Sequence, residues 1–211
     1  LFGDNFTQAY KKALEDCKTN GKTFIHPFDD IKVIEGQATV FLEILNQFKN
    51  KIDYIFIPIG GGGLISGAIN VFKQLSPSTK IVGIEPMGAP SMFKSLEQNK
   101  LVTLEKINGF VDGAAVKKVG NYSFDYCKDF LDDIILIDEG EICKSILDLH
   151  KIEGIIAEPA GAMSAAALRQ YKDKIINKNV VCLICGGNND EQRMPEINKR
   201  AKTWMINNPS C

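Results

Sequence analysis

The chain has 211 residues, of which 45% are hydrophobic and 24% are charged, and its formal net charge is -1 at pH 7. This composition is typical of a globular protein with one sizeable core, or with one domain and part of another. Because 25 basic residues face 26 acidic ones, we expect neither a nucleic acid nor a membrane as partner. No apolar stretch has the length of a membrane span, and no signal-peptide pattern follows Leu1, although the chain opens without Met.

The first segments predict two helices joined by an extended piece. Residues 4–22 form an amphipathic pattern with cap residues between Asp4 and Thr7 and a stop at Gly21. The short stretch "TFIHPF" then leads into a long helix over residues 33–49. Its inward face is expected to consist of Ala38, Phe41, Leu42, Leu45 and Phe48.

Residues 54–75 predict a strand, a glycine loop and a helix in direct succession. "YIFIPI" is a continuous apolar run, which is typical of a strand buried on both faces. Four glycines, Gly60 to Gly63, follow it, and their cost in conformational entropy argues against a simple turn. Free N–H groups and the positive end of a helix dipole meet at such a junction, which therefore indicates a phosphate site. The apolar stripe of the helix comprises Leu64, Ile65, Ala68, Val71, Phe72 and Leu75.

Two classes of phosphate-binding protein use this geometry. A Walker A loop needs Lys and then Ser or Thr after its last glycine, whereas Leu64 and Ile65 stand there. A dinucleotide-binding crossover fits better, because the next strand, "KIVGIE", ends in Glu85, where a ribose-binding acid would lie. Taken alone, the segment from the glycine loop to Glu85 favours a nicotinamide or flavin enzyme.

The remaining segments continue the alternation of strands and helices. A short helix is expected at residues 91–98, a helix at 123–131, the strand "DIILI" at 133–137 and a helix at 142–150. A helix within "IIAEPAGAMSAAALRQY", the strand "NVVCLI" and a last charged helix follow. This order predicts an α/β fold with an open, mainly parallel twisted sheet and helices on both faces. Ligands of such sheets bind at the carboxyl ends of the strands.

The six cysteines are Cys17, Cys127, Cys143, Cys182, Cys185 and Cys211. Cys182 and Cys185 form a C-x-x-C pair within a predicted strand, where residues three apart point to opposite faces. We therefore favour buried free thiols in a reducing compartment, the cytoplasm, over a metal or disulfide site. Cys185 stands at the end of the strand and is followed at once by "GGNND".

Three motifs are expected at one edge of the sheet. The glycine loop and "CGGNN" follow strands, and "EPAGA", which starts at Glu158, opens a helix. A dinucleotide fold explains only the first of these motifs. A compact ring cofactor with a phosphate explains all three. The glycine loop would hold the phosphate, the "CGGNN" motif would place a side chain at the ring nitrogen, and "EPAGA" would place an acid behind the ring.

Seven stretches in this order carry a resemblance that covers nearly the whole chain. They are "FIHPFDD", "VIEGQATVFLEIL", "PIGGGGLISG", "GIEP", "VDGAAV", "AEPAGA" and "CGGNND". The chain resembles the fold type II pyridoxal-phosphate enzymes, whose large domain is tryptophan synthase β-like, and most closely the threonine dehydratases (threonine ammonia-lyases). Serine racemases and serine dehydratases are relatives.

The resemblance implies a set of residues that bind pyridoxal 5'-phosphate. The phosphate would be held by Gly60, Gly61, Gly62, Gly63 and Leu64. Cys185, with Gly186 beside it, would face the pyridine nitrogen, Glu158 would lie near the ring, and Asp112 with Gly113 would lie near the cofactor's hydroxyl group.

The resemblance also implies a reaction, the β-elimination of L-threonine, and of L-serine, to 2-oxobutanoate or pyruvate and ammonia. Such a reaction belongs to isoleucine biosynthesis or amino-acid catabolism. A neutral thiol cannot hold the pyridine nitrogen protonated, which weakens the electron sink and favours prompt loss of the β-hydroxyl. The family suggests a homo-oligomer, a dimer or tetramer.

The family's Schiff-base lysine, in an S-x-K-x-R-G type segment, and its S-G-N-H substrate loop do not occur in the 211 residues. We therefore expect residues 1–22 to be a remnant of the smaller domain and residues 23–211 to be the large domain. A partial chain is favoured over half of a split enzyme or a degenerate relative, because every glycine for the phosphate is present. Some relatives hold a divalent cation at positions that match Glu85 and Ala89, but Ser91 replaces the third ligand, an aspartate, so no metal is predicted.

Overall fold

A computed structural model describes residues 2–3 and 6–209. The predicted cap at Asp4 and the cysteine Cys211 lie outside the described residues. The helices are α1 (Phe6–Asn20), α2 (Ile31–Gln47), α3 (Gly63–Leu75), α4 (Ser91–Glu97), α5 (Asn121–Phe130), α6 (Glu139–Glu153), α7 (Pro159–Tyr171) and α8 (Met194–Asn207), with a 3-10 turn, η1 (Glu191–Arg193). The strands are β1 (Tyr54–Pro58), β2 (Lys80–Pro86), β3 (Asp133–Ile137) and β4 (Val180–Cys182).

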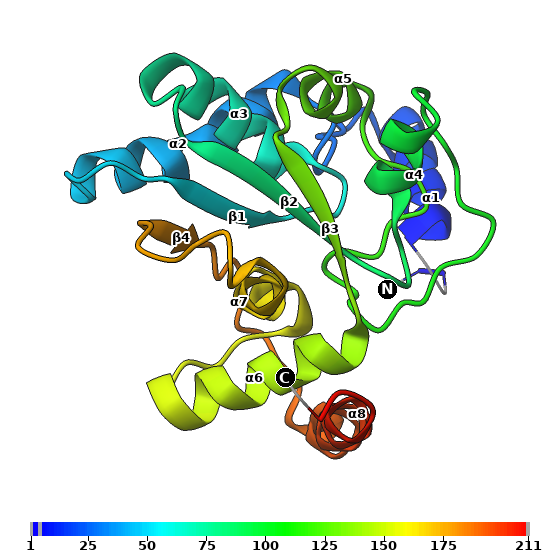
Figure 1. Cartoon of the computed structure of the whole chain (residues 1–211). Coiled ribbons are helices and arrows are strands. Elements are labelled where there is room, and N and C mark those ends of the chain that lie inside the picture. The colour runs from blue at the N-terminus through cyan, green and yellow to red at the C-terminus, as the bar shows by residue number, and fades with distance from the viewer. Residues whose placement is uncertain (1, 4–5, 210–211) are drawn as a thin grey trace.

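The four strands form one parallel sheet in the order β3-β2-β1-β4. Helices α2, α3 and α5 cover one face, and α6, α7 and α8 lie on the other (Figure 1). Side chains of β1 alternate between the two cores, because Phe56 packs with α7 whereas Ile55 and Ile57 pack with α3. The predicted α/β fold and the strand buried on both faces are confirmed.

The structure corrects the extents of several elements, among them α2, which begins and ends two residues earlier than predicted, and two of the corrections have a clear physical reason. Strand β4 is shorter than the predicted "NVVCLI", because it pairs only with the first part of β1, Tyr54–Phe56, before β1 passes into the glycine loop. Helix α6 begins earlier than predicted, at Glu139, since the Asp138 side chain accepts the Gly140 N–H at 2.7 Å and caps the helix.

Three apolar side chains that were expected inside lie outside. Leu42, Phe48 and Leu75 are 41%, 38% and 62% exposed. Phe41 is buried against Phe72 of α3, as predicted, and Ile34 is the other buried side chain of α2. The stripe predicted for α3 was otherwise right at Ile65, Ala68, Val71 and Phe72, which are buried.

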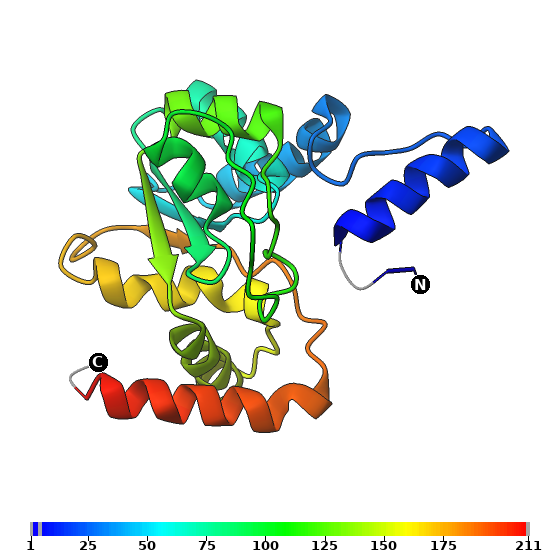
Figure 2. The same ribbon diagram turned by 90° about the vertical axis from the view of Figure 1, so that its right-hand side faces the viewer.

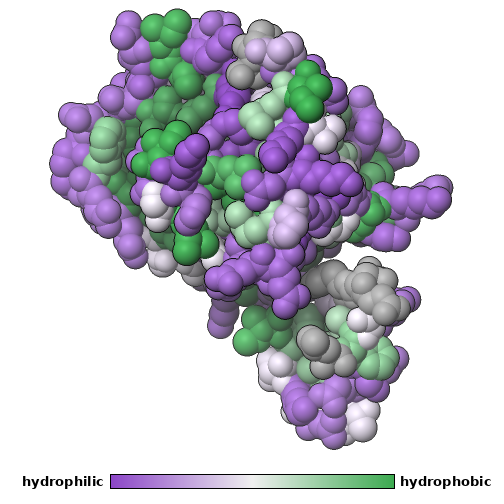
Figure 3. Space-filling view, turned by 90° about the horizontal axis from the view of Figure 1, so that it is seen from below, coloured by the Kyte–Doolittle hydropathy of each residue, from purple (hydrophilic) through white to green (hydrophobic). Residues whose placement is uncertain are grey.

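Helix α1 stands apart from the rest of the molecule. An extended segment connects it to α2 (Figure 2), and it projects as a lobe when the molecule is seen from below (Figure 3). It ends at Asn20, and Gly21 follows with a φ of 63°, so the predicted stop is confirmed. Among the described helices, none combines the length and the apolar character that crossing a membrane requires.

Candidate functional site

A cavity of about 370 Å³ opens at the carboxyl end of β1, where the strand passes into α3. It brings together the predicted residues Gly60–Leu64, Asp112, Gly113 and Cys185 from three separate parts of the chain. The further lining residues are Pro27, Phe28, Gln37, Pro58, Ala114, Ala115, Val116 and Ala160. The carboxyl edge of the sheet is thus the place where the motifs meet, as expected for this fold class.

The glycine loop presents backbone N–H groups that have no protein partner. In α3 the first amide with such a partner is that of Ser66, which donates to the Gly62 carbonyl at 3.0 Å. Within the described part of the chain, none of the N–H groups of residues 60–65 has a protein acceptor. Together with the positive end of the α3 dipole, these donors form a site suited to an anion.

Packing of Phe28 explains a glycine in this loop. A Cβ atom at Gly61 would lie 2.2 Å from carbon atoms of the Phe28 ring, so only glycine fits beneath it. Sequence reasoning quoted Phe28 within "FIHPFDD" but did not place it in the site, because nothing local to that stretch indicates the contact. Gln37 and Ala160 were also missed as lining residues.

Gly62 has a different reason to be glycine. Its φ is 95°, a conformation that residues with a Cβ atom rarely adopt. A Cβ atom there would also lie 2.5 Å from the Cβ of Ser123, at the start of α5. The loop is therefore packed on both sides while its N–H groups remain free.

Glu158 lies behind the cavity wall rather than in it. It is the residue before α7, its N–H donates to the Gly186 carbonyl at 3.1 Å, and its carboxylate accepts the Asn188 N–H at 3.2 Å. Cβ atoms at Gly113 and Gly186 would lie 3.3 Å and 2.3 Å from this carboxylate. Glu158 thus fills the space between the Asp112–Gly113 loop and the loop that follows Cys185.

Cys185 lines the cavity and is exposed, so the expectation of a buried thiol was wrong at this position. The strand ends before it, which places it on the loop at the mouth of the cavity. The residue as a whole is exposed, but protein atoms partly enclose its sulfur. This partial desolvation, and then the nearby Glu158 carboxylate, raise the pKa of the Cys185 thiol above its ordinary value. Of the other described cysteines, Cys127 and Cys143 are buried free thiols, and Cys17 and Cys182 are half-buried.

Glu85 is not available to a ligand in the cavity. It is 0% exposed, and its two carboxyl oxygens accept the N–H groups of Met92 and Phe93 at 2.7 Å and 2.8 Å. The carbonyl of Ala89 in turn accepts the Ser91 N–H at 3.0 Å. Both oxygens of Glu85 accept hydrogen bonds from the start of α4, so Glu85 cannot bind a ribose. The dinucleotide interpretation required Glu85 as its ribose-binding residue, and the structure therefore argues against that interpretation.

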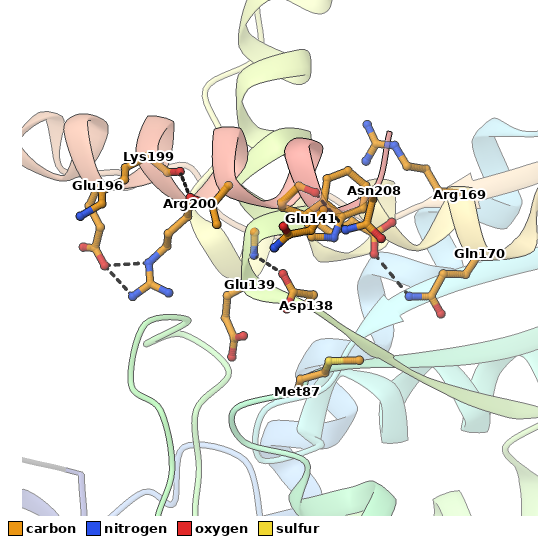
Figure 4. Close-up of a pocket in the computed structure, with 14 residues that line it drawn as sticks. Met87, Asp138, Glu139, Glu141, Arg169, Gln170, Glu196, Lys199, Arg200 and Asn208 are labelled. Carbon is orange, nitrogen blue, oxygen red and sulfur yellow. Dashed lines mark hydrogen bonds and ion pairs between the residues drawn. The ribbon is translucent and has the colours of Figure 1, made fainter. Parts of the chain in front are cut away.

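A larger cavity, of about 810 Å³, lies between α6, α7 and α8 (Figure 4). Its two arginines form ion pairs within the protein: Arg200 contacts Glu196 at 2.7 Å, and Arg169 contacts Asp148 at 2.8 Å. None of the residues expected to bind a cofactor lines it. The smaller cavity at the glycine loop is therefore the candidate site.

Curated proteins of known function are similar in sequence to this chain. The chain is 52% identical to the biosynthetic L-threonine dehydratase IlvA of Halalkalibacterium halodurans over 201 residues, and 50% identical to that of Bacillus subtilis over 201 residues. Each alignment covers 95% of this chain and 48% of the relative. The chain thus spans about half the length of the curated relatives it matches.

Solved structures agree with these matches. The processed form of threonine deaminase isoform 2 from Solanum lycopersicum superimposes with a TM-score of 0.91 at 40% identity, over 96% of this chain and 56% of that one. A maize serine racemase gives a TM-score of 0.84 at 30% identity, over 94% and 63% of the two chains. The model of the pyridoxal-phosphate dependent enzymes matches residues 1–186, and the chain belongs to this family.

Proposed function

We propose that this chain is the cofactor-binding part of a threonine dehydratase, which converts L-threonine to 2-oxobutanoate and ammonia, and L-serine to pyruvate and ammonia. The observation that carries the proposal is the row of unpartnered N–H groups at residues 60–65, in one cavity with Cys185 and Asp112. The 50–52% identity to biosynthetic L-threonine dehydratases supports the choice of reaction.

The residues present fit the phosphate of pyridoxal 5'-phosphate. A phosphate group needs several convergent donors and a positive potential, and the start of α3 offers both without a cationic side chain. The cavity, of about 370 Å³, lies within the usual range for small-molecule sites. Gly60, Gly61, Gly62, Gly63 and Leu64 would hold the phosphate.

The other cavity residues would orient and tune the ring. When bound, pyridoxal phosphate supplies an electron sink for loss of the substrate's α-proton and β-hydroxyl group. Cys185 would face the ring nitrogen as a neutral thiol, since its raised pKa disfavours the thiolate. A neutral thiol does not hold that nitrogen protonated, so the sink stays weak and elimination is favoured over reactions that need a long-lived carbanion.

Asp112 and Gly113 would border the cofactor's hydroxyl group, and Glu158 with Gly186 would support this wall from behind. Glu158 suits this supporting role because its carboxylate already accepts the Asn188 N–H. The Glu158 carboxylate also lies next to Gly113, so Glu158 lies between the two loops that border the ring.

The covalent anchor would come from sequence outside these 211 residues. Among the described residues that line the cavity there is no lysine. We assign residues 1–22, which include the whole of α1, to the smaller domain and residues 23–211 to the large domain. The way α1 stands apart supports this division (Figure 2). We place the enzyme in the cytoplasm and expect a homo-oligomer, a dimer or tetramer.

The proposal is tested first by binding. Titration of the chain with pyridoxal phosphate, followed by calorimetry, should show one site, and pyridoxal without its phosphate should bind at least tenfold more weakly, about the contribution of one strong anion contact. NAD should not bind. Binding of NAD in place of pyridoxal phosphate would support the dinucleotide alternative and overturn the proposal.

The reaction is tested by supplying the missing part. Mixing the chain with an upstream segment that carries the family's Schiff-base lysine should yield 2-oxobutanoate from threonine. Borohydride reduction and peptide mass spectrometry should then locate the modified lysine on the added segment. Cofactor binding without any product from a correctly assembled mixture would point to a degenerate relative.

A further inference from the structure

Arg193, the last residue of η1, makes three contacts with one loop, whose first residue, Phe110, lies 83 residues earlier in the chain. Its Nη2 donates to the Phe110 carbonyl at 2.6 Å. Its guanidinium carbon lies 4.9 Å from the centroid of the Phe110 ring, and its Nη1 lies 3.6 Å from Asp112 Oδ1. A single side chain thus contacts the backbone, the ring and the carboxylate of this loop.

The side chains of Phe110, Val111 and Ala114 are buried in the core, but the backbone of the loop over residues 110–114 has no long-range hydrogen bond among the described residues apart from the one with Arg193. Its other hydrogen bonds are local: the Gly113 N–H donates to Asp112 Oδ1 at 3.1 Å, the Ala114 N–H to the Val111 carbonyl at 2.9 Å and the Phe110 N–H to Asn108 Oδ1 at 3.0 Å. It contains no helix or strand. Its conformation therefore depends on contacts with neighbouring elements, and the contacts of Arg193 are among the strongest of these.

The same loop forms a wall of the candidate site. Asp112, Gly113 and Ala114 line the cavity. A Cβ atom at Gly60 would lie 3.1 Å from the Gly113 carbonyl oxygen, so the loop also abuts the first glycine of the phosphate loop. We call the part of the cavity that Asp112, Gly113 and Ala114 form its ring side, because the proposed cofactor ring would lie there. A shift of the loop would change this ring side, whereas the free N–H groups at the start of α3 would keep their positions.

We infer that Arg193 is a positioning residue, which holds the loop of residues 110–114 in the conformation that forms the ring side of the cavity. The inference rests on the proposed function for the identity of the ligand. Arginine is needed because its planar guanidinium lies over a ring and donates hydrogen bonds in its own plane at the same time. A lysine keeps the charge but cannot make both contacts from one position.

The chain offers a matched control in Arg200 of α8. Its guanidinium lies 4.2 Å from the centroid of the same Phe110 ring. Its hydrogen bond, however, goes to Glu196 at 2.8 Å and not to the loop (Figure 4). Arg200→Ala therefore removes a cation over Phe110 and leaves the loop's hydrogen bond with Arg193 in place.

Hydrogen exchange of the chain without ligand tests the inference directly. In Arg193→Ala and Arg193→Lys, amide exchange in the peptide that covers residues 110–116 should become at least about tenfold faster, the effect of losing one charge-assisted hydrogen bond. Exchange in the peptides of β1 and α3 should not change, and Arg200→Ala should match the parent chain throughout. Unchanged exchange at residues 110–116 in Arg193→Ala would overturn the inference.

Ligand binding provides the second readout. The dissociation constant of pyridoxal phosphate should rise about tenfold in both Arg193 variants, and the absorption band of the bound ligand should shift, because the ring side of the cavity has changed. Binding of inorganic phosphate, the second probe, should be the same as in the parent. Equal loss of phosphate and pyridoxal phosphate would mean general damage to the site and contradict the inference. Failure of the parent itself to bind pyridoxal phosphate would overturn the proposed function, while the exchange result would still decide the role of Arg193.

Discussion

The ring of Phe28 lies against the backbone of Gly61, so close that a Cβ atom on Gly61 would come within 2.2 Å of the ring carbons. Phe28 precedes α2, and Gly61 belongs to the loop between β1 and α3. The contact therefore fixes the position of the segment that connects α1 to the rest of the molecule. It also means that a glycine assigned to phosphate binding is equally required for packing.

Gly61→Ala should lower the free energy of unfolding by about 1–3 kcal/mol, because the added methyl group overpacks the contact with Phe28. The backbone at Gly61 does not have a positive φ, so the cost arises from the ring alone. Phe28→Ala should remove most of this cost when it is combined with Gly61→Ala. Urea denaturation of the two single variants and the double variant gives the coupling between them.

Gly36→Ala serves as the control. Gly36 lies within α2, and a Cβ atom there would have no neighbour within 4 Å. The substitution should therefore raise the free energy of unfolding by about 0.5–1 kcal/mol. If Gly61→Ala and Phe28→Ala were strictly additive, the contact would not be the reason for the glycine.

Gly62→Ala should also destabilise the chain, by about 1–3 kcal/mol, but for a different reason. Its φ of 95° strains any residue with a Cβ atom, whatever space surrounds it. Ser123→Gly, which opens the space next to Gly62, should therefore not restore stability. Denaturation of both variants and their combination measures this, and full rescue by Ser123→Gly would show that crowding rather than φ sets the cost.

Sequence patterns identified the strand, the glycine loop and helix α3, because an apolar run, four glycines and a helical stripe are all local signals. They also predicted that Cys185 would meet this loop, since parallel strands place their carboxyl ends at one edge. The contact of Phe28 with Gly61 could not be predicted in this way. It depends on how a segment 33 residues earlier approaches the loop, and no local pattern encodes that approach.

Exposure was harder to predict than secondary structure. Leu42 and Leu75 have the spacing of inward residues, yet both lie on the surface, lining a cavity of about 350 Å³ between α2 and α3. Glu85 shows the opposite error, because a carboxylate at a strand end suggested a ligand, whereas the structure buries it under α4. Periodicity gives the face of an element, but only the packed neighbours decide how much of that face is covered.

Alkylation of Cys185 by iodoacetamide should be slower at pH 7 than alkylation of a free cysteine in solution, although Cys185 is exposed. Partial desolvation of its sulfur and the Glu158 carboxylate raise the pKa of this thiol, so less thiolate is present at neutral pH. The rate should keep rising with pH beyond the point at which free cysteine levels off. Peptide mass spectrometry measures the rate at this site.

Glu158→Gln gives the matched comparison for Cys185. It removes the second cause of the raised pKa, and the pH at which alkylation accelerates should therefore fall. Saturating pyridoxal phosphate should slow alkylation in both proteins, because Cys185 lines the cavity. Alkylation at pH 7 as fast as that of free cysteine would contradict the raised pKa and, with it, the neutral thiol at the ring nitrogen.

The stability of the fold should depend on the protonation of Glu85. Burial raises the pKa of this carboxyl from 4.5 to about 8, and the N–H groups of Met92 and Phe93 offset only part of that effect. The unfolded chain loses the proton near pH 4.5, whereas the folded chain keeps it until about pH 8. The contribution of Glu85 is therefore fully present below pH 4.5 and is lost as the pH rises through 8, a change on the order of a few kcal/mol.

Glu85→Gln removes this titration. The amide can accept only one of the two N–H groups of α4, so the variant should be less stable than the parent at pH 5, by about 1–3 kcal/mol. The gap should narrow as the pH is raised from 5 to 8, because only the parent loses stability from this group. Urea denaturation at four pH values in this range measures the gap. Glu97→Gln, at an exposed position of α4, is the control, and its free energy of unfolding should differ from that of the parent by the same amount at all four pH values. If the difference between Glu85→Gln and the parent stayed constant or widened with pH, Glu85 would already be ionised in the folded chain.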